Sequence, residues 1–442
     1  MPIFIHPEAA KRFDEIARAL VRQVIPLNLS QPQADKYDLH PVATVTERDV
    51  IGKIEYTTDI LDSNGLVIGR ESTVNGRSYG LVGSGFTECQ DLAGRLAGLA
   101  EIQESVSIKF ACETALDWIF RAFWGTQAET LTQFLAARCE REIKDYEIWT
   151  PIFQTYSSQE FSLGDVRFKP ISKEMLDRRF ANAPDVPKAK QYEDKTRSKL
   201  QSVLAACIQV KAENEKAHQI ARAKAYDSTA LLRFLSTTNL HLNSQSYCLP
   251  LGRERVEISN DLHVSDGSIA TICQSALKRG PVAWDIDRER TQFPHLLSLL
   301  DKLASGRTAS KYQSSLYDAL LLYGRNSVAT EAADKLVFVL VALESMLLKN
   351  TGEFIKKSIG VRIAWLTGNT REERIAIAEN VEHVYDVRSR FIHHGDTVQD
   401  IEPIDRFLHS AWLSFNRLLE RIDTVSTKQE LIAELDAQMF GS

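Results

Sequence analysis

The sequence predicts an α+β region over residues 1–280, followed by an all-α helical bundle over residues 281–442. In the first part, short runs of alternating apolar and polar residues are separated by Asn-Gly pairs, which are a strong signal for β-hairpins. From Asp285 onward, apolar residues instead recur at helical spacing, and glycines or polar loops separate the segments. Short connections between consecutive helices favour antiparallel neighbours, as in a helix bundle.

The elements predicted for the α+β region are helices and small sheets in alternation. An amphipathic helix over 7–24 is expected first, and alternating runs divided by Asn64-Gly65 and Asn75-Gly76 then predict an antiparallel sheet over 42–82. Further helices are expected at 105–144 (divided by Gly125), at 173–180, and at 192–235 as one long helix or two consecutive ones. Further strands are expected at 147–156, 160–172 and 246–273.

Two features of this region suggest ligands but have simpler interpretations. Gly80, Gly83 and Gly85 lie close together, yet no Gly-Lys-Ser/Thr sequence follows them, so they predict a turn and not a nucleotide site. The lysines and arginines of residues 192–235 are interpreted as a solvated helix face, with an RNA-contacting surface as the alternative.

The bundle is expected to consist of amphipathic helices with short connections. The last of them could pack on the bundle or on a partner. The predicted helices cover residues 292–304, 310–323, 329–349, 353–367, 371–392, 403–424 and 427–439.

Composition is that of a soluble protein of two or three domains. The chain has 442 residues, of which 44% are hydrophobic and 25% charged. Its formal net charge of −6 argues against wholesale electrostatic binding to nucleic acid, so an RNA substrate would need a local basic cluster. No run approaches 18 uncharged apolar residues and no signal peptide is recognisable, so we expect a cytoplasmic protein that does not bind membranes.

The cysteine pattern indicates neither a disulfide framework nor a metal site. The six cysteines lie far apart, without a Cys-x-x-Cys pair and without a histidine at zinc-finger spacing. We therefore expect free thiols in a reducing compartment, and neither a metal nor a cofactor.

The stretch from Val384 to Asp396, which reads VYDVRSRFIHHGD, concentrates groups suited to phosphate chemistry. An apolar-periodic helix is expected to end at Gly395, because glycine enters the left-handed conformation without steric cost. Within two turns of that end lie Arg388, Arg390, His393 and His394. A guanidinium binds oxyanions in a fork, and an imidazole exchanges protons near pH 7.

Helix geometry limits which of these side chains can act together. On a continuous helix, Arg388 and His393 point roughly 140° apart. They converge only if the helix breaks before His393, which the following Gly395 would permit, or if they face a partner chain. Arg390 and His394 are four residues apart and share a face without any break.

Three runs resemble a known family when taken together. DKLVFVLVALESMLLKN, SIGVRIAWLTG and VYDVRSRFIHHGD follow one another in the sequence. They resemble the Apea-like branch of the HEPN superfamily, in which an ALE-x-LL helix, an R-x-A-x-L helix and a Y-D-x-R-S-x-x-x-H segment occur in this order. The resemblance covers roughly residues 285–423, with weaker similarity upstream at WTPIFQTY and FSLGDVRFKPIS.

This resemblance implies a HEPN helical bundle that forms a homodimer and acts as a metal-independent endoribonuclease on tRNA or mRNA. The cellular setting it implies is phage defence or toxin-like growth arrest, with the α+β region sensing a trigger or restraining the nuclease. The family's Arg-x4–6-His motif matches Arg388 and His393, and a polar residue on an early helix matches Glu344. In such enzymes the ribose 2′-hydroxyl attacks the adjacent phosphodiester; His393 would transfer the proton and Arg388 would stabilise the charge on phosphorus oxygens. Supporting roles would fall to Arg390, His394 and Asp386.

Other interpretations of the same residues remain open. Arg388 could be structural and pair with Asp386, Glu382 or Asp405, and Glu344 could face solvent or pair with Arg362. The bundle could also be a non-catalytic dimer that binds RNA, a nucleotide or a partner protein, or a scaffold without a ligand.

Overall fold

The computed structural model describes most of the chain. The described residues are 5–27, 55–74, 77–181, 186–246, 248–250, 258–265, 268–276, 284–306, 309–329, 331–349, 352–394 and 401–440, with side chains described in these ranges except at 55–56, 258–276, 392–394 and 440. Contacts group the chain into an N-terminal unit (residues 1–146 and 209–220) and a C-terminal unit (147–208 and 221–442). The domain boundary expected near Gly280 lies outside the described residues.

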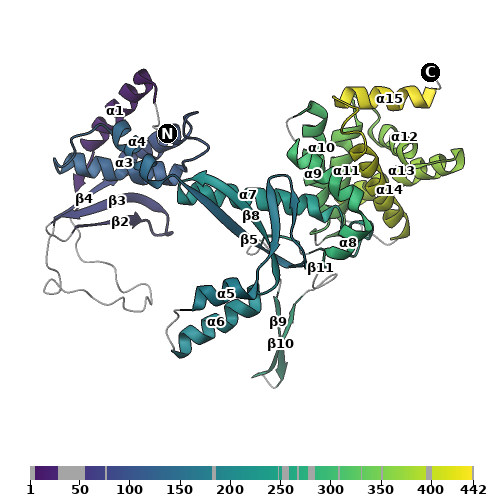
Figure 1. The fold of residues 1–442 in the computed structure, drawn as a ribbon, viewed down its shortest axis with the longest axis horizontal. Helices are drawn as coiled ribbons and strands as arrows, with labels where there is room; N and C mark the ends of the chain where they lie inside the picture. The colour runs from purple at the N-terminus through teal and green to yellow at the C-terminus, as the bar shows by residue number, and fades with distance from the viewer. Residues whose placement is uncertain are drawn as a thin grey trace. The chain divides into compact units, whose positions relative to one another are not determined.

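The N-terminal unit packs helices against a small antiparallel sheet (Figure 1). Its sheet has the order β1-β4-β3-β2, from β1 (Ile25–Pro26), β2 (Glu55–Leu61), β3 (Val67–Val74) and β4 (Arg77–Val82). Its helices are α1 (Pro7–Val21), α2 (Ser84–Ala97), α3 (Ile108–Phe123) and α4 (Leu131–Glu142). They share one core, in which Leu20, Leu92, Ile119 and Leu131 are almost fully buried. Burial of such aliphatic side chains is the main stabilising term of the unit.

The described part of this unit agrees with the main sequence predictions. The predicted hairpin at Asn64-Gly65 joins β2 to β3, and Gly65 adopts a φ of 77° that favours glycine. Gly125 divides the predicted helix 105–144, as expected, and Gly83 forms the predicted turn between β4 and α2. The remainder of the predicted sheet, residues 42–54, and the Asn75-Gly76 pair lie outside the described residues.

The sheet of the C-terminal unit has five strands in the order β11-β5-β8-β7-β6. These are β5 (Lys144–Tyr156), β6 (Phe161–Leu163), β7 (Val166–Pro170), β8 (Val203–Ala212) and β11 (Trp284–Asp285). The remaining elements before the bundle are α5 (Lys173–Phe180), α6 (Pro187–Leu200), α7 (Asn214–Arg233), η3 (Thr237–Leu240) and a hairpin of β9 (Ile258–Ser265) with β10 (Ser268–Ala276). Strands β5 and β8 and helix α7 contain residues of both units.

The prediction of one long helix or two consecutive helices over 192–235 is wrong in the middle of this range, where β8 lies. Eight of the ten residues of β8 are buried, including Leu204, Ala205 and Ile208 at 0% exposure. A strand that is covered on both faces is apolar throughout, so it lacks the alternation that identifies a strand in a sequence. The charged residues before and after it belong to α6 and α7, which are helical as predicted.

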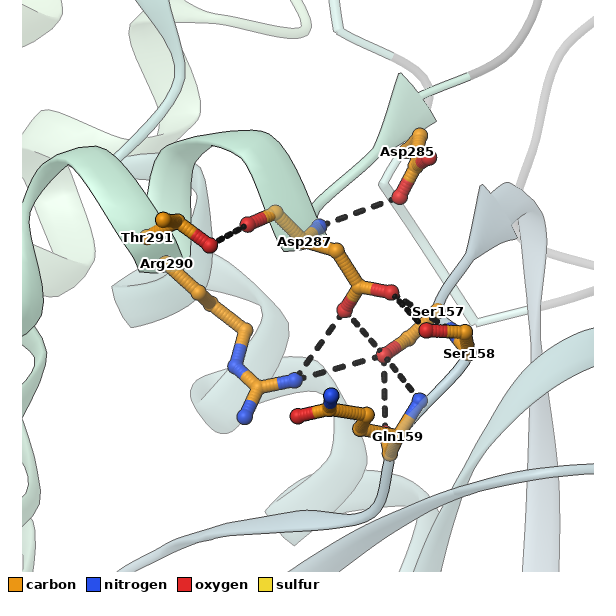
Figure 2. Close-up of polar contacts among 7 residues, drawn as sticks. All are labelled: Ser157, Ser158, Gln159, Asp285, Asp287, Arg290 and Thr291. Atoms are coloured by element: carbon orange, nitrogen blue, oxygen red, sulfur yellow. Dashed lines mark hydrogen bonds and ion pairs between the residues drawn. The ribbon is translucent and has the colours of Figure 1, made fainter.

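The end of β5 is fixed to the first turn of α8 (Asp287–Gln292) by a partly exposed polar cluster (Figure 2). The Asp287 carboxylate accepts hydrogen bonds from the Ser157 hydroxyl and from the backbone and hydroxyl of Ser158, each at 2.6 Å, and from Arg290 at 3.1 Å. Burial raises the pKa of Asp287, but these hydrogen bonds and the Arg290 charge outweigh it, so the pKa is lowered overall. The cluster therefore contains a stable carboxylate that ties the sheet to the helices that follow.

After Asp285, the described residues form only helices and their connections, as predicted (Figure 1). Beyond α8 these are α9 (Pro294–Ser305), α10 (Lys311–Asn326), α11 (Ala332–Leu347), α12 (Ile355–Thr367), α13 (Arg371–His394), α14 (Glu402–Leu419) and α15 (Lys428–Phe440). Helix α13 begins with a reciprocal cap, in which the Glu373 backbone donates to the Thr370 hydroxyl and the Glu373 carboxylate accepts from the Thr370 backbone. Gly360 allows α12 and α13 to approach closely, because a Cβ there would lie 3.1 Å from the Ala378 carbonyl oxygen.

Two further contacts join helices of the bundle, α10 and α11, to the segment of α7 and η3 that precedes it in the sequence. Helices α7 and α10 cross at Gly324, where a Cβ would lie only 2.3 Å from the carbonyl oxygen of Ala230. Lys335 of α11 is 1% exposed, and its ammonium donates to the backbone carbonyls of residues 238, 241 and 244 at 2.5–2.9 Å. Lys335 thus orders the loop that follows η3.

Candidate functional site

Helices α11 and α13 bring three of the motif side chains together. Tyr385 of α13 is 9% exposed, and its hydroxyl donates a hydrogen bond of 2.9 Å to Glu344 of α11. Arg388 lies one turn further along α13 on the same face as Tyr385, because residues three apart on a helix are neighbours. Glu344 therefore contacts the Val384–Asp396 stretch directly, through Tyr385, which we did not predict as a site residue.

The electrostatics of this cluster keep Tyr385 protonated. Burial of the Tyr385 hydroxyl raises its pKa most, the charge and hydrogen bond of Glu344 raise it further, and Arg388 lowers it. A phenol whose pKa is raised remains a hydrogen-bond donor throughout the physiological range. Tyr385 therefore serves to position Glu344 and cannot act as a base near pH 7.

Arg388 is half-buried and lacks a carboxylate partner among the described residues. Of the three structural partners that the sequence suggested, Asp386 pairs with Lys356 and Asp405 pairs with His241. The Nε atom of Arg388 is buried and has no hydrogen-bond partner. A guanidinium in this state retains unsatisfied donors that are suited to an oxyanion.

Two of the predicted supporting residues, Asp386 and Arg390, lie on the exposed surface of α13. Asp386 is exposed, and its carboxylate accepts from Lys356 of α12 at 3.0 and 3.4 Å. Arg390 is also exposed. Lys356, which pairs with Asp386, was not predicted as part of the site.

Helix α13 is continuous from Arg371 to His394, so the break that would bring His393 beside Arg388 is not found. On a continuous helix, positions 388 and 393 lie roughly 140° apart around the helix axis. The side chains of His393 and His394 lie outside the described residues, as do Gly395 and Asp396. Of the two arrangements that the sequence left open, the one in which Arg388 and His393 face a partner chain fits a continuous helix.

Arg362 of the second motif has a structural role, and the predicted alternative that it pairs with Glu344 is wrong. Its side chain is 4% exposed and forms a two-pronged ion pair with Glu353, with both N–O distances 2.9 Å. It also pairs with Asp436 of α15 at 3.2 Å and donates to the Leu347 carbonyl at 2.6 Å. Arg362 joins the end of α11 to α12 and α15, and so supports the helix that bears Glu344.

Apolar side chains are also exposed on α11, which bears Glu344, and at the start of α12, which bears Lys356. Val341, one turn before Glu344 on α11, is 38% exposed, and Phe354 and Ile355, next to Lys356, are 85% and 42% exposed. We call the adjacent residues Phe354 and Ile355 the apolar patch. A large exposed aromatic with apolar neighbours marks a candidate protein–protein contact.

Neither a metal site nor a membrane-spanning helix is present in the described ranges. No group of three or more His, Cys, Asp or Glu side chains is arranged to bind a metal ion there. No helix in that part of the chain is both long and apolar enough to cross a bilayer. Cys89, Cys112, Cys139, Cys207 and Cys248 are free thiols, as the sequence predicts.

No protein-family model, curated protein or solved structure matches the chain.

Proposed function

We propose that the chain is a metal-independent endoribonuclease of the HEPN type that acts as a homodimer in the cytoplasm. The observation that supports this most is Arg388. It is a half-buried guanidinium with an unpartnered Nε and no carboxylate partner among the described residues, held beside the Tyr385–Glu344 pair. Such a guanidinium is suited to binding a phosphate, because a bound phosphate would provide a hydrogen-bond acceptor for an N–H group that otherwise has no partner.

The proposed reaction forms a bond between the ribose 2′-oxygen and phosphorus and breaks the bond to the 5′-oxygen. His393 accepts the proton of the 2′-hydroxyl, and a protonated histidine returns a proton to the departing 5′-oxygen. Arg388 contacts the non-bridging oxygens as negative charge develops on them. The products are a 2′,3′-cyclic phosphate and a 5′-hydroxyl.

A homodimer supplies the geometry that a single chain lacks. On continuous α13 helices, Arg388 of one chain and His393 of the other can approach a common phosphate if the two helices meet across a two-fold axis. The apolar patch supports such an interface, because Phe354 and Ile355 adjoin Lys356, which pairs with Asp386 two residues before Arg388. The Tyr385–Glu344 pair then lies on the same face of α13 as Arg388, one turn away.

The second candidate is a non-catalytic dimer that binds RNA through the same cations. The continuity of α13 favours it, since Arg388 and His393 of one chain do not share a face. In that case Arg388, Arg390 and Lys356 contact phosphates and no bond is broken.

One experiment separates the two candidates. Purified protein is incubated with total RNA in EDTA, beside the variants His393→Ala and His383→Ala. His383 is a matched control, because it is an exposed histidine on the same helix. We expect cleavage by the wild type and His383→Ala, and a loss on the order of 100-fold or more in His393→Ala. Equal cleavage by all three proteins, or none by the wild type, would contradict the nuclease proposal.

The resemblance assigns such an enzyme to phage defence or to toxin-like growth arrest, with tRNA or mRNA as the substrate. In this setting the N-terminal unit restrains the nuclease until a trigger arrives.

A further inference from the structure

The N-terminal unit contains a large pocket that the proposed nuclease does not use. Its volume is about 1030 Å³, and it lies between the sheet and helices α3 and α4. Strand register places its floor on one sheet face, since Thr57 pairs with Ser72 and Val74 pairs with Arg77. Ligand sites in proteins usually measure about 300–1,000 Å³, so the pocket is large enough for a nucleotide.

The lining of the pocket is rich in arginine. Four arginines contribute from four elements, whereas only two carboxylates, Glu113 and Asp117, line it. The arginines are Arg70 of β3, Arg77 of β4, Arg121 of α3 and Arg138 of α4. In a chain with a formal net charge of −6, this local excess of positive charge indicates an anionic ligand.

Two of these arginines retain unsatisfied donors. Arg70 pairs with Asp59, and Asp117 is shared between Arg121 at 2.7 Å and Arg138 at 3.7 Å. The Nε atom of Arg138 is buried without a partner. Arg77 is exposed and forms no ion pair with a described residue. Because Asp117 is shared between Arg121 and Arg138, and Arg77 has no described carboxylate partner, the lining keeps guanidinium groups that suit phosphate oxygens.

An aromatic side chain completes the lining. Trp124 is half-buried, and its ring is held edge-on by Tyr79 and Phe123, with centroid distances of 5.1 Å in both pairs. The Nε1 atom of Trp124 is buried and has no hydrogen-bond partner. Because Trp124 lines the pocket, its indole offers a flat apolar surface on which a nucleobase can stack.

We propose that this pocket binds a nucleotide, with Arg77 and Arg138 contacting its phosphates and Trp124 contacting its base. This goes beyond the proposed nuclease, because the site lies wholly within the N-terminal unit and binding is measurable without RNA cleavage. A small phosphorylated ligand is favoured over a nucleic-acid strand, because the arginines converge on one pocket from four elements instead of following a surface groove.

The test is calorimetric titration of the full-length chain with ATP, GTP, CTP and UTP, each up to 1 mM, which is roughly the weak end of specific small-ligand affinity. Adenosine, inorganic triphosphate and a short single-stranded RNA are the comparison ligands. We expect at least one nucleotide to bind in the micromolar range, and the adenosine and triphosphate fragments to bind at least tenfold more weakly, because each lacks one set of contacts.

Two variants assign the binding to the pocket. Arg77→Gln should weaken nucleotide binding at least tenfold, since it removes a charge-assisted phosphate contact from an exposed side chain whose loss leaves the melting temperature unchanged. Arg12→Gln is the matched control, because Arg12 is exposed on α1 and is not part of the pocket lining. Binding of no nucleotide, equal binding by Arg77→Gln, triphosphate binding as tight as that of the nucleotides, or binding of the RNA alone would each overturn the proposal.

Discussion

The Arg362–Glu353 pair provides a stability prediction whose magnitude can be worked out. The Glu353 side chain is 18% exposed, and the hydrogen bonds from Arg362 lower its pKa from 4.5 to about 2, against the opposing effect of burial. Because the folded-state pKa is depressed, the contribution of Glu353 to stability is fully present above the unfolded-state pKa and is lost as pH falls toward 2. One pKa unit corresponds to about 1.4 kcal/mol, so the contribution at neutral pH is about 3 kcal/mol.

The perturbation is Glu353→Gln, measured by urea unfolding from pH 7 down to pH 3. We expect the variant to lose about 3 kcal/mol relative to wild type at pH 7. The difference should shrink to about 1 kcal/mol at pH 3, because there the carboxylate is protonated in the unfolded state, so that folding requires the loss of its proton. Glu379→Gln is the matched control, because Glu379 is exposed on α13, and it should change stability by about 0.5 kcal/mol or less at either pH. A loss for Glu353→Gln that stays the same at both pH values would refute the electrostatic reasoning.

Three further predictions concern packing, the buried lysine and self-association. Gly324→Ala should destabilise the chain by about 2 kcal/mol or more, because the new methyl group would clash with the Ala230 carbonyl. Gly94→Ala is the control and should be neutral or stabilising, because there is open space around its Cβ. Equal urea midpoints for the two variants would contradict this prediction. Lys335→Met should lower the free energy of unfolding by about 3 kcal/mol, because three backbone carbonyls lose their hydrogen-bond donor. Lys311→Met, at an exposed position, is the control and should lower it little. Similar unfolding curves for the two variants would show that the carbonyls find other partners. Sedimentation velocity should show a dimer for the wild type and a monomer for Phe354→Asp. Ile375→Asp, also at an exposed position, is the control and should remain dimeric. A monomeric wild type at micromolar concentration would contradict the proposed interface.

Local patterns predicted most elements of the described fold. The hairpin at Asn64-Gly65, the division of a helix at Gly125 and the helical nature of the chain after Asp285 each follow from a turn residue or a period that is visible in a few neighbouring residues. Strand β8 could not be recognised in this way, because its burial on both faces depends on its neighbours in the sheet.

The sequence motifs indicate Arg388 and Glu344 as candidate site residues, whereas the contact of Glu344 with Tyr385 could not be predicted from them. Arg388 and Glu344 come from motifs far apart in the sequence, and the tyrosine between them becomes visible only once α11 packs against α13. Tyr385 could have been found as the aromatic residue one turn before Arg388 on the same face. Conversely, Arg362 could not be assigned from sequence, because its partner Asp436 lies on α15, 74 residues away.

The pocket in the N-terminal unit was not foreseen either. Its arginines come from separate elements and form no cluster in the sequence, so only strand register and helix packing reveal that they surround one volume.

The most direct test of the central claim compares activity and stability in Arg388→Ala, with Arg371→Ala as the control for loss of an exposed arginine on the same helix. The measurement is the rate at which a defined RNA gains 2′,3′-cyclic phosphate ends in EDTA, recorded beside thermal melts of the same preparations. We predict that Arg388→Ala loses activity on the order of 100-fold while its stability changes by about 1 kcal/mol or less, because no described carboxylate depends on it. Undiminished cleavage by folded Arg388→Ala, or a loss of about 3–5 kcal/mol in stability as expected for a broken buried ion pair, would contradict a phosphate-binding role for this residue.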